Sequence, residues 1–132
     1  MELARKIPLE VHGNEPRGGT LIDIKITKHF GFQIQEAHWI VNEPSMMSER
    51  GGHFHKNKKE VYLIQKGEAE VILRNTEGKT ETLILSEKEP VALEILPYIH
   101  HTVSRMSEGA ILLVLQSETW NAENADTYSE FD

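Results

Sequence analysis

Residues 50–60 of the chain read RGGHFHKNKKE, which places two histidines one residue apart and a glutamate five residues after the second. On a β-strand, side chains two positions apart face the same way, so His53 and His55 can point their rings into one cavity. A strand that starts at Glu60 and ends at Gly67 returns a carboxylate to the same region. The stretch predicts a strand-built site of two imidazoles and a carboxylate, which suits a divalent metal or proton transfer at a bound substrate.

A second histidine block lies further along the chain and reads PYIHHTVS over residues 97–104. Strand alternation favours an inward-facing His101, whereas His100 can face either the surface or the pocket. A single histidine on a strand is usually structural, and we expect this of His12 and His29. The two blocks resemble those of the cupin family, which implies a double-stranded β-helix, or jelly-roll barrel, with histidines of both blocks lining its pocket.

Apolar residues recur with a period of two through most of the chain, as in strands with one buried face. Turn signals rich in Gly, Pro and Asn separate these stretches, and no helical pattern of useful length appears before residue 118. Short strands spaced in this way predict an all-β sandwich or barrel. The expected strands cover residues 22–26, 37–41, 61–65, 69–73, 82–85, 91–95, 102–106 and 110–116.

The length of 132 residues predicts one cupin domain over residues 1–132, with an acidic C-terminal tail over residues 118–132. The tail carries no Lys or Arg. Its aromatic residues Trp120, Tyr128 and Phe131 predict that it docks on the barrel, because burying each of them stabilises the fold by about 1.5–3 kcal/mol.

The composition argues against several classes of partner. A formal net charge of −7 without a long basic stripe argues against nucleic acid. No apolar run reaches the ~18 residues that a membrane-spanning helix needs. The chain has no cysteine and its first residues lack the apolar stretch of a signal peptide, so we expect a cytoplasmic protein without disulfides.

Over most of the chain, the order of motifs resembles the cupin-type dTDP-4-keto-6-deoxyhexose 3,4-ketoisomerases of nucleotide-sugar biosynthesis. The matching features are an early Arg-Gly at Arg17, the Arg-Gly-x-His-x-His block that starts at Arg50, Pro97 followed four residues later by His101, and an aromatic, acidic tail. The resemblance implies a jelly-roll homodimer that uses no metal and binds a nucleotide sugar. We expect Arg17, Arg50 and His101 to contact this substrate, with the Arg50 guanidinium binding its diphosphate or positioning a sugar oxygen.

Three features depart from that family, and one of them is that residues 14–17, NEPR, match its usual acidic residue and Arg-Gly only loosely. Glu60 stands where these isomerases usually have Gln, and residues 36–39 read EAHW where they usually have an Arg and a Tyr pair. A Gln is a poor metal ligand and a Glu a good one. The chain also resembles the metal-binding cupin domains of capsular nucleotide-sugar epimerases, which have a similar Arg-Gly-Gly-His-aromatic-His block with Glu five residues later.

Three functions therefore stay open. In an isomerase, His53 and His55 are catalytic and remove the proton next to a 4-keto group, forming an enediol. In a metal-dependent epimerase or other metal cupin enzyme, His53, His55, Glu60 and His101 ligate a zinc, nickel, iron or manganese ion. A ligated histidine cannot be the base, so His38, also expected to contact the substrate, would move the proton. In the third case, the protein binds a sugar or metabolite without turnover.

Overall fold

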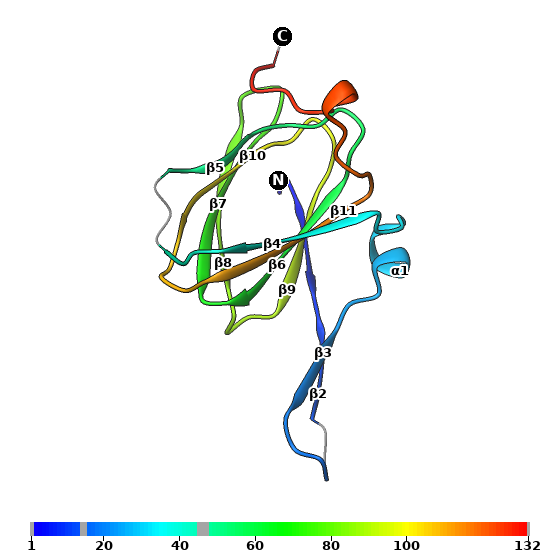
Figure 1. Ribbon diagram of the computed structural model, residues 1–132, viewed down its shortest axis with the longest axis vertical. Coiled ribbons are helices and arrows are strands. Elements are labelled where there is room, and N and C mark those ends of the chain that lie inside the picture. The colour runs from blue at the N-terminus through cyan, green and yellow to red at the C-terminus, as the bar shows by residue number, and fades with distance from the viewer. Residues whose placement is uncertain (1, 14–15, 45–47, 132) are drawn as a thin grey trace.

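Antiparallel strands make up most of the fold in the computed structural model of the chain, which describes residues 2–13, 16–44 and 48–131 (Figure 1). The strands are β1 (Arg5–Pro8), β2 (Glu10–Gly13), β3 (Thr20–Asp23), β4 (Glu36–Val41), β5 (Arg50–His53), β6 (Glu60–Lys66), β7 (Glu68–Arg74), β8 (Thr80–Ser86), β9 (Val91–Ile95), β10 (His100–Met106) and β11 (Ile111–Gln116). The helical segments in these ranges are α1 (Ile26–Phe30) and the 3₁₀ turn η1 (Ala122–Asn124). The all-β class predicted from the sequence is confirmed.

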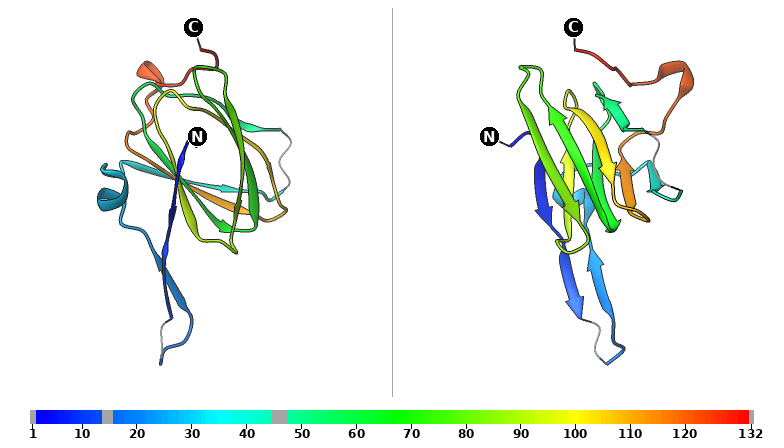
Figure 2. Two further views of the ribbon diagram at one scale, coloured as in Figure 1. Left: turned by 180° about the vertical axis from the view of Figure 1, so that it is seen from behind. Right: turned by 90° about the vertical axis from the view of Figure 1, so that its left-hand side faces the viewer.

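Two sheets face each other and form the jelly-roll barrel, one in the strand order β1-β9-β6-β11-β4 and the other in the order β5-β10-β7-β8 (Figure 2). Leu73 and Leu85 from the second sheet pack with Leu93 and Leu112 from the first, and all four are completely buried. Because alternate residues of each strand face the opposite sheet, this core explains the period of two in the sequence.

Strand pairing brings the two histidine blocks together. His53 on β5 is the direct partner of His101 on β10, and Glu60 on β6 is the partner of Gln116 on β11 in the other sheet. Gly51 permits the close approach of β5 to β10. Its φ is +80°, and a Cβ built there would lie 2.7 Å from the carbonyl oxygen of His101. Both the conformation and the available space therefore require glycine at this position.

The predicted strand over residues 22–26 is wrong in its second half. A short helix also lies before residue 118, where the sequence showed no helical pattern of useful length. Strand β3 ends at Asp23, and α1 begins at Ile26. Ile26 and Phe30, four residues apart, lie on one face of α1 and are buried with the apolar residues on the outer face of the five-stranded sheet. A helix of five residues is too short to reveal its period in the sequence, so the alternating isoleucines gave a misleading signal.

The hairpin of β2 and β3 extends away from the barrel (Figures 1 and 2). It leaves Val11, Leu21 and Ile22 about half exposed, at 54%, 50% and 49%. On the barrel, Trp39 and Val41 of the edge strand β4 are also exposed on the outer face. These apolar side chains are candidates for burial by a second copy of the chain.

The C-terminal tail docks on the barrel, as predicted, through two of its three aromatic residues. Tyr128 forms a β-bridge with Phe54, and the Phe131 ring packs on the Phe54 ring with centroids 4.5 Å apart. The expectation is wrong for Trp120, which is 59% exposed. The predicted ends of the domain, Met1 and Asp132, lie outside the described residues. Among those residues, no helix is long and apolar enough to cross a membrane.

Candidate functional site

Three histidine rings meet between the two sheets. The ring centroid of His53 lies 4.9 Å from that of His55 and 4.8 Å from that of His101. The centroids of His55 and His101 are 5.2 Å apart. One nitrogen from each ring lies within 4.8 Å of the others. His55 and His101 are buried, whereas His53 is partly exposed to the pocket. The structure therefore brings together the three histidines that the sequence predicted to converge.

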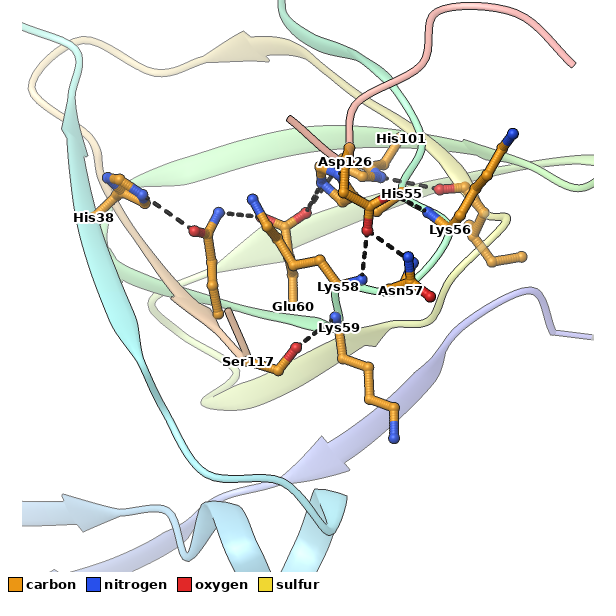
Figure 3. Close-up of polar contacts among 12 residues, drawn as sticks. His38, His55, Lys56, Asn57, Lys58, Lys59, Glu60, His101, Ser117 and Asp126 are labelled. Carbon is orange, nitrogen blue, oxygen red and sulfur yellow. Dashed lines mark hydrogen bonds and ion pairs between the residues drawn. The ribbon is translucent and has the colours of Figure 1, made fainter. Parts of the chain in front are cut away.

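Glu60 links two of these rings and is itself buried. Its Oε1 lies 3.0 Å from Nε2 of His55 and 3.0 Å from Nε2 of His101 (Figure 3). Its Oε2 accepts a hydrogen bond of 2.7 Å from the Gln116 side chain. Gln116 in turn accepts from Nε2 of His38 at 3.2 Å, and the same nitrogen lies 2.7 Å from Glu36. A polar chain thus runs from His38 through Gln116 to the centre of the site.

The other ring nitrogens fix the tautomers of His55 and His101. Nδ1 of His55 is 2.5 Å from the backbone carbonyl oxygen of Asp126, and Nδ1 of His101 is 3.0 Å from that of Ile99. A carbonyl only accepts, so each Nδ1 carries the proton. In a neutral ring, Nε2 then presents a lone pair to the Glu60 carboxylate. Lone pairs and a carboxylate at 3.0 Å repel each other unless a positive charge, either a proton or a metal ion, lies among them.

Burial and neighbouring charges shift the pKa values of the site. Burial, and then the charges of His101 and His55, lowers the pKa of His53 from 6.5 to about 4. Burial alone would raise the pKa of Glu60, but the His101 and His55 rings beside it hold that pKa well below its usual range. Burial, followed by the Glu60 charge, raises the pKa of Tyr62 well above 10. At neutral pH the site therefore holds a neutral His53, an ionised Glu60 and a protonated Tyr62.

A pocket of about 280 Å³ gives access to the cluster from the side of β4 and β5. His53, Glu60 and Tyr62 contribute to its walls, together with His38 and Arg50 from the two edge strands. A ligand in this pocket can therefore contact His53 directly, whereas His55 and His101 lie behind it. The sequence reading did not identify Gln116 or Tyr62, because a polar or aromatic residue within an apolar strand gives no distinctive signal.

The C-terminal tail supports the site through Asp126, which the sequence reading also missed. Its carboxylate accepts hydrogen bonds from the backbone N–H groups of Lys56, Asn57 and Lys58 at 2.7–2.9 Å (Figure 3). Its backbone carbonyl holds the His55 ring. About 70 residues separate the two segments, so no local pattern could have paired them.

The remaining residues predicted from the sequence lie outside the cluster. Arg17 is exposed in the connection between β2 and β3 and does not line the histidine pocket of its own chain. His12 is exposed on the hairpin, where it pairs with Asp23 at 3.1 Å. His29 lies on α1. His100 is partly buried, with its ring 6.3 Å from that of Phe131. None of these residues contributes to the walls of the histidine pocket.

The cluster also fits a divalent metal ion. Three imidazole nitrogens and a carboxylate oxygen are a common ligand set for zinc, nickel, iron and manganese. Nε2 of His101 is buried and makes no aligned hydrogen bond with the described residues, although Glu60 lies at ion-pair distance. An ion bound by His53, His55 and His101 would satisfy this nitrogen, and it would lie near the Glu60 carboxylate, which is 3.0 Å from Nε2 of two of these rings. It would also remove the repulsion described above.

Comparisons with known proteins match nearly the whole chain. A family model described as FdtA, WxcM-like, C-terminal, matches residues 5–132. The UDP-2-acetamido-2,6-beta-L-arabino-hexul-4-ose reductase of Pseudomonas aeruginosa is 27% identical over 118 residues, which cover 88% of this chain and 30% of that protein. The chain thus spans less than a third of the length of this curated relative.

Solved structures with the same fold include several 3,4-ketoisomerases. The TDP-quinovose 3,4-ketoisomerase WlaRB of Campylobacter jejuni is 26% identical, with a TM-score of 0.83 over 98% of this chain and 95% of that chain. A 3,4-ketoisomerase from Helicobacter canadensis is 24% identical, with a TM-score of 0.81 over 96% of this chain and 90% of that chain. The expected resemblance to dTDP-sugar ketoisomerases is confirmed.

Proposed function

This chain belongs to the FdtA family of WxcM-like C-terminal domains, and we propose that it is an isomerase of a nucleotide-linked 4-keto-6-deoxy sugar. The reaction moves the keto group from C4 to C3 of the sugar through an enediol. The observation that carries the proposal is a neutral imidazole, His53, at the wall of a pocket backed by a buried Glu60 and two further histidines.

His53 is the base in this proposal. His55 has both ring nitrogens engaged, with a backbone carbonyl and with Glu60, and Nε2 of His101 is buried beside Glu60, whereas His53 faces the pocket. The base takes the proton from C3, and the C–H electron pair forms the double bond between C3 and C4 as O4 gains negative charge. Return of the carbon-bound proton to C4, with transfer of the O3 proton to O4, completes the isomerisation without a net change in protons.

The surroundings of His53 supply the groups that this enediolate needs. Tyr62 stays protonated and lines the pocket, so its hydroxyl can donate to a sugar oxygen. Arg50 lines the same pocket and offers a fork of donors to another sugar oxygen. A positive charge among His55, His101 and Glu60 would stabilise the developing oxyanion electrostatically.

A divalent metal is the second candidate for that positive charge. It is favoured by Nε2 of His101, which is buried and makes no aligned hydrogen bond with the described residues. When bound, the ion would polarise the sugar carbonyl as a Lewis acid. His53 would then give its lone pair to the ion, and His38, at the pocket wall, is the histidine left to move a proton. Elemental analysis of protein purified without a metal-affinity column tests for the ion.

A homodimer and a cytoplasmic location remain predictions. The half-exposed apolar residues of the projecting hairpin, Val11, Leu21 and Ile22, support dimerisation because a second copy would bury them. Contact between Arg17 and the substrate also remains a prediction. Sedimentation at micromolar concentration should give a species near 30 kDa, twice the chain mass of 15.1 kDa. A single 15.1 kDa species would contradict the dimer.

The activity itself is tested by incubating the protein with a TDP-linked 4-keto-6-deoxy sugar and following the sugar by NMR. We expect a 3-keto product and exchange of the C3 proton. Binding of the sugar nucleotide with neither product nor exchange would instead support a protein that binds the sugar without turnover.

A further inference from the structure

A second pocket, of about 450 Å³, lies beneath the C-terminal tail. Its walls come from three segments: the residue before β4, the loop before β6, and the chain that follows β11. Hydroxyl and amide side chains contribute most of the wall, and the exposed Trp120 is also part of it. None of the residues that line the histidine pocket lines this one.

Lys58, in the wall of this pocket, is buried without a counter-ion. It is 4% exposed, yet its ammonium group forms no hydrogen bond or ion pair with the described residues. The contact of Lys58 with Asp126 runs through the backbone N–H and does not reach the ammonium. By contrast, the buried Glu94 pairs with Arg5 at 3.2 Å. Among the described residues, the buried side-chain nitrogens without a hydrogen bond belong to His29 and His101, so the Lys58 ammonium itself reaches the open pocket, where an anion can pair with it.

The other charged side chains of the pocket leave this position open to an anion. The Asp126 carboxylate already accepts three backbone N–H groups. Glu118 is exposed and makes no ion pair with Lys58 within the described residues. Ser117 Oγ accepts the backbone N–H of Lys59 at 2.8 Å, which leaves its own proton free for donation. One ammonium group and neutral donors suit an anion with several acceptor oxygens, such as a phosphate.

Some residues that line the pocket of Lys58 are close in sequence to residues that line the histidine pocket. Lys58 precedes Glu60 by two residues, and Ser117 directly follows Gln116. Two residues of extended chain span about 7 Å, the scale of one sugar ring. Figure 3 shows the three lysine side chains of this loop diverging: Lys58 runs towards Glu60, whereas Lys56 and Lys59 point away from it.

We propose that Lys58 and the pocket beneath the tail form an anion subsite that binds the diphosphate of the sugar nucleotide while the keto sugar lies against His53. The inference rests on the proposed function for the identity of the ligand. It adds a residue that binds the non-reacting part of the substrate, and it assigns the tail a part in substrate binding. Arg50, in the other pocket, is then left to contact the sugar.

The test is calorimetric titration of the full chain with TDP, UDP and inorganic pyrophosphate. Three proteins are compared: the wild type, Lys58→Met and Lys59→Met. Lys59 is the matched control, because it lies next to Lys58, carries the same charge and does not line the pocket. We expect Lys58→Met to weaken TDP or UDP binding at least tenfold, about 1.4 kcal/mol, and Lys59→Met to change it less than twofold.

Lys58→Met should fold, because Met keeps most of the buried apolar stem of this side chain and the Lys58 ammonium forms no hydrogen bond or ion pair with the described residues. If it does not fold, Lys58→Gln serves instead. Equal losses in both variants, unchanged affinity in Lys58→Met, or no binding of TDP or UDP to the wild type would overturn the subsite. Loss of pyrophosphate binding alone would point to a free phosphate ligand and overturn the assignment to a sugar nucleotide. If the protein binds TDP through Lys58 but does not isomerise the sugar, the proposed function fails while the subsite stands.

Discussion

Replacing Gly51 with alanine should damage the site far more than the same change at Gly52. Both glycines have left-handed φ values, +80° and +74°, so either alanine costs about 1–2 kcal/mol in backbone strain. Only at Gly51 would the new Cβ meet backbone, 2.7 Å from the carbonyl oxygen of His101. These atoms must separate by about 0.7 Å to reach ordinary contact at 3.4 Å, whereas a Cβ at Gly52 meets nothing within 4 Å.

Overpacking of this kind costs typically 1–3 kcal/mol more, so we expect a total loss of about 2–5 kcal/mol in the free energy of unfolding for Gly51→Ala. Gly52→Ala should lose only about 1–2 kcal/mol. Urea unfolding of the two variants and the wild type measures the difference directly. Since the clash lies where β5 pairs with β10, Gly51→Ala should also reduce isomerase activity more than Gly52→Ala. Equal losses of stability in the two variants would refute the close approach of these strands.

Three further changes probe other parts of the site. If the cluster binds a divalent metal, Glu60→Gln removes the carboxylate on which two histidines converge, so the metal content should fall at least tenfold by elemental analysis; an unchanged metal content would remove Glu60 from the ligand set. Asp126→Ala leaves three backbone N–H groups without their carboxylate, and denaturant unfolding should show a loss of about 1–3 kcal/mol, whereas a loss below 0.5 kcal/mol would show that the tail does not support the loop. The pKa of His53, lowered to about 4, keeps this base neutral, so activity of the folded enzyme should persist from pH 7 to about pH 5. The same shift makes the free energy of unfolding decrease as pH falls from about 6.5 towards 4, because the unfolded chain takes up a proton that folded His53 does not. A rate that halves near pH 6.5 in the folded enzyme would contradict the lowered pKa.

Strand alternation predicted the all-β barrel and the convergence of His53, His55 and Glu60, whereas the resemblance to cupins implied that His101 lines the same pocket. Side chains two apart share a face, and apolar residues with a period of two identify the strands that form the core. The outcome for β3 and α1 shows the limit of this signal. Alternating isoleucines mark a strand only while the chain stays extended, and a five-residue helix packed on the sheet depends on tertiary contacts.

The parts of the site that escaped prediction depend on contacts between segments distant in the chain. Gln116 reaches Glu60 only because β11 pairs with β6 in one particular register. Asp126 meets the loop after His55 only because the tail folds back across the barrel. In the sequence, Lys58 is one of three lysines in the segment before Glu60, and only its burial distinguishes it from Lys56 and Lys59. Register, tail docking and burial are properties of the assembled fold.

Proton exchange at the sugar tests the central claim most directly. A TDP-linked 4-keto-6-deoxy sugar is incubated in D₂O with the wild type and with His53→Gln, and NMR follows the C3 and C4 positions. The account predicts deuterium at these carbons and a 3-keto product with the wild type. His53→Gln, which keeps a polar side chain but has no basic nitrogen, should bind the nucleotide and slow exchange at least a hundredfold, since general base catalysis contributes about 10²–10⁴-fold. Exchange by His53→Gln at the wild-type rate, or none with the wild type, would contradict the assignment of His53 as the base.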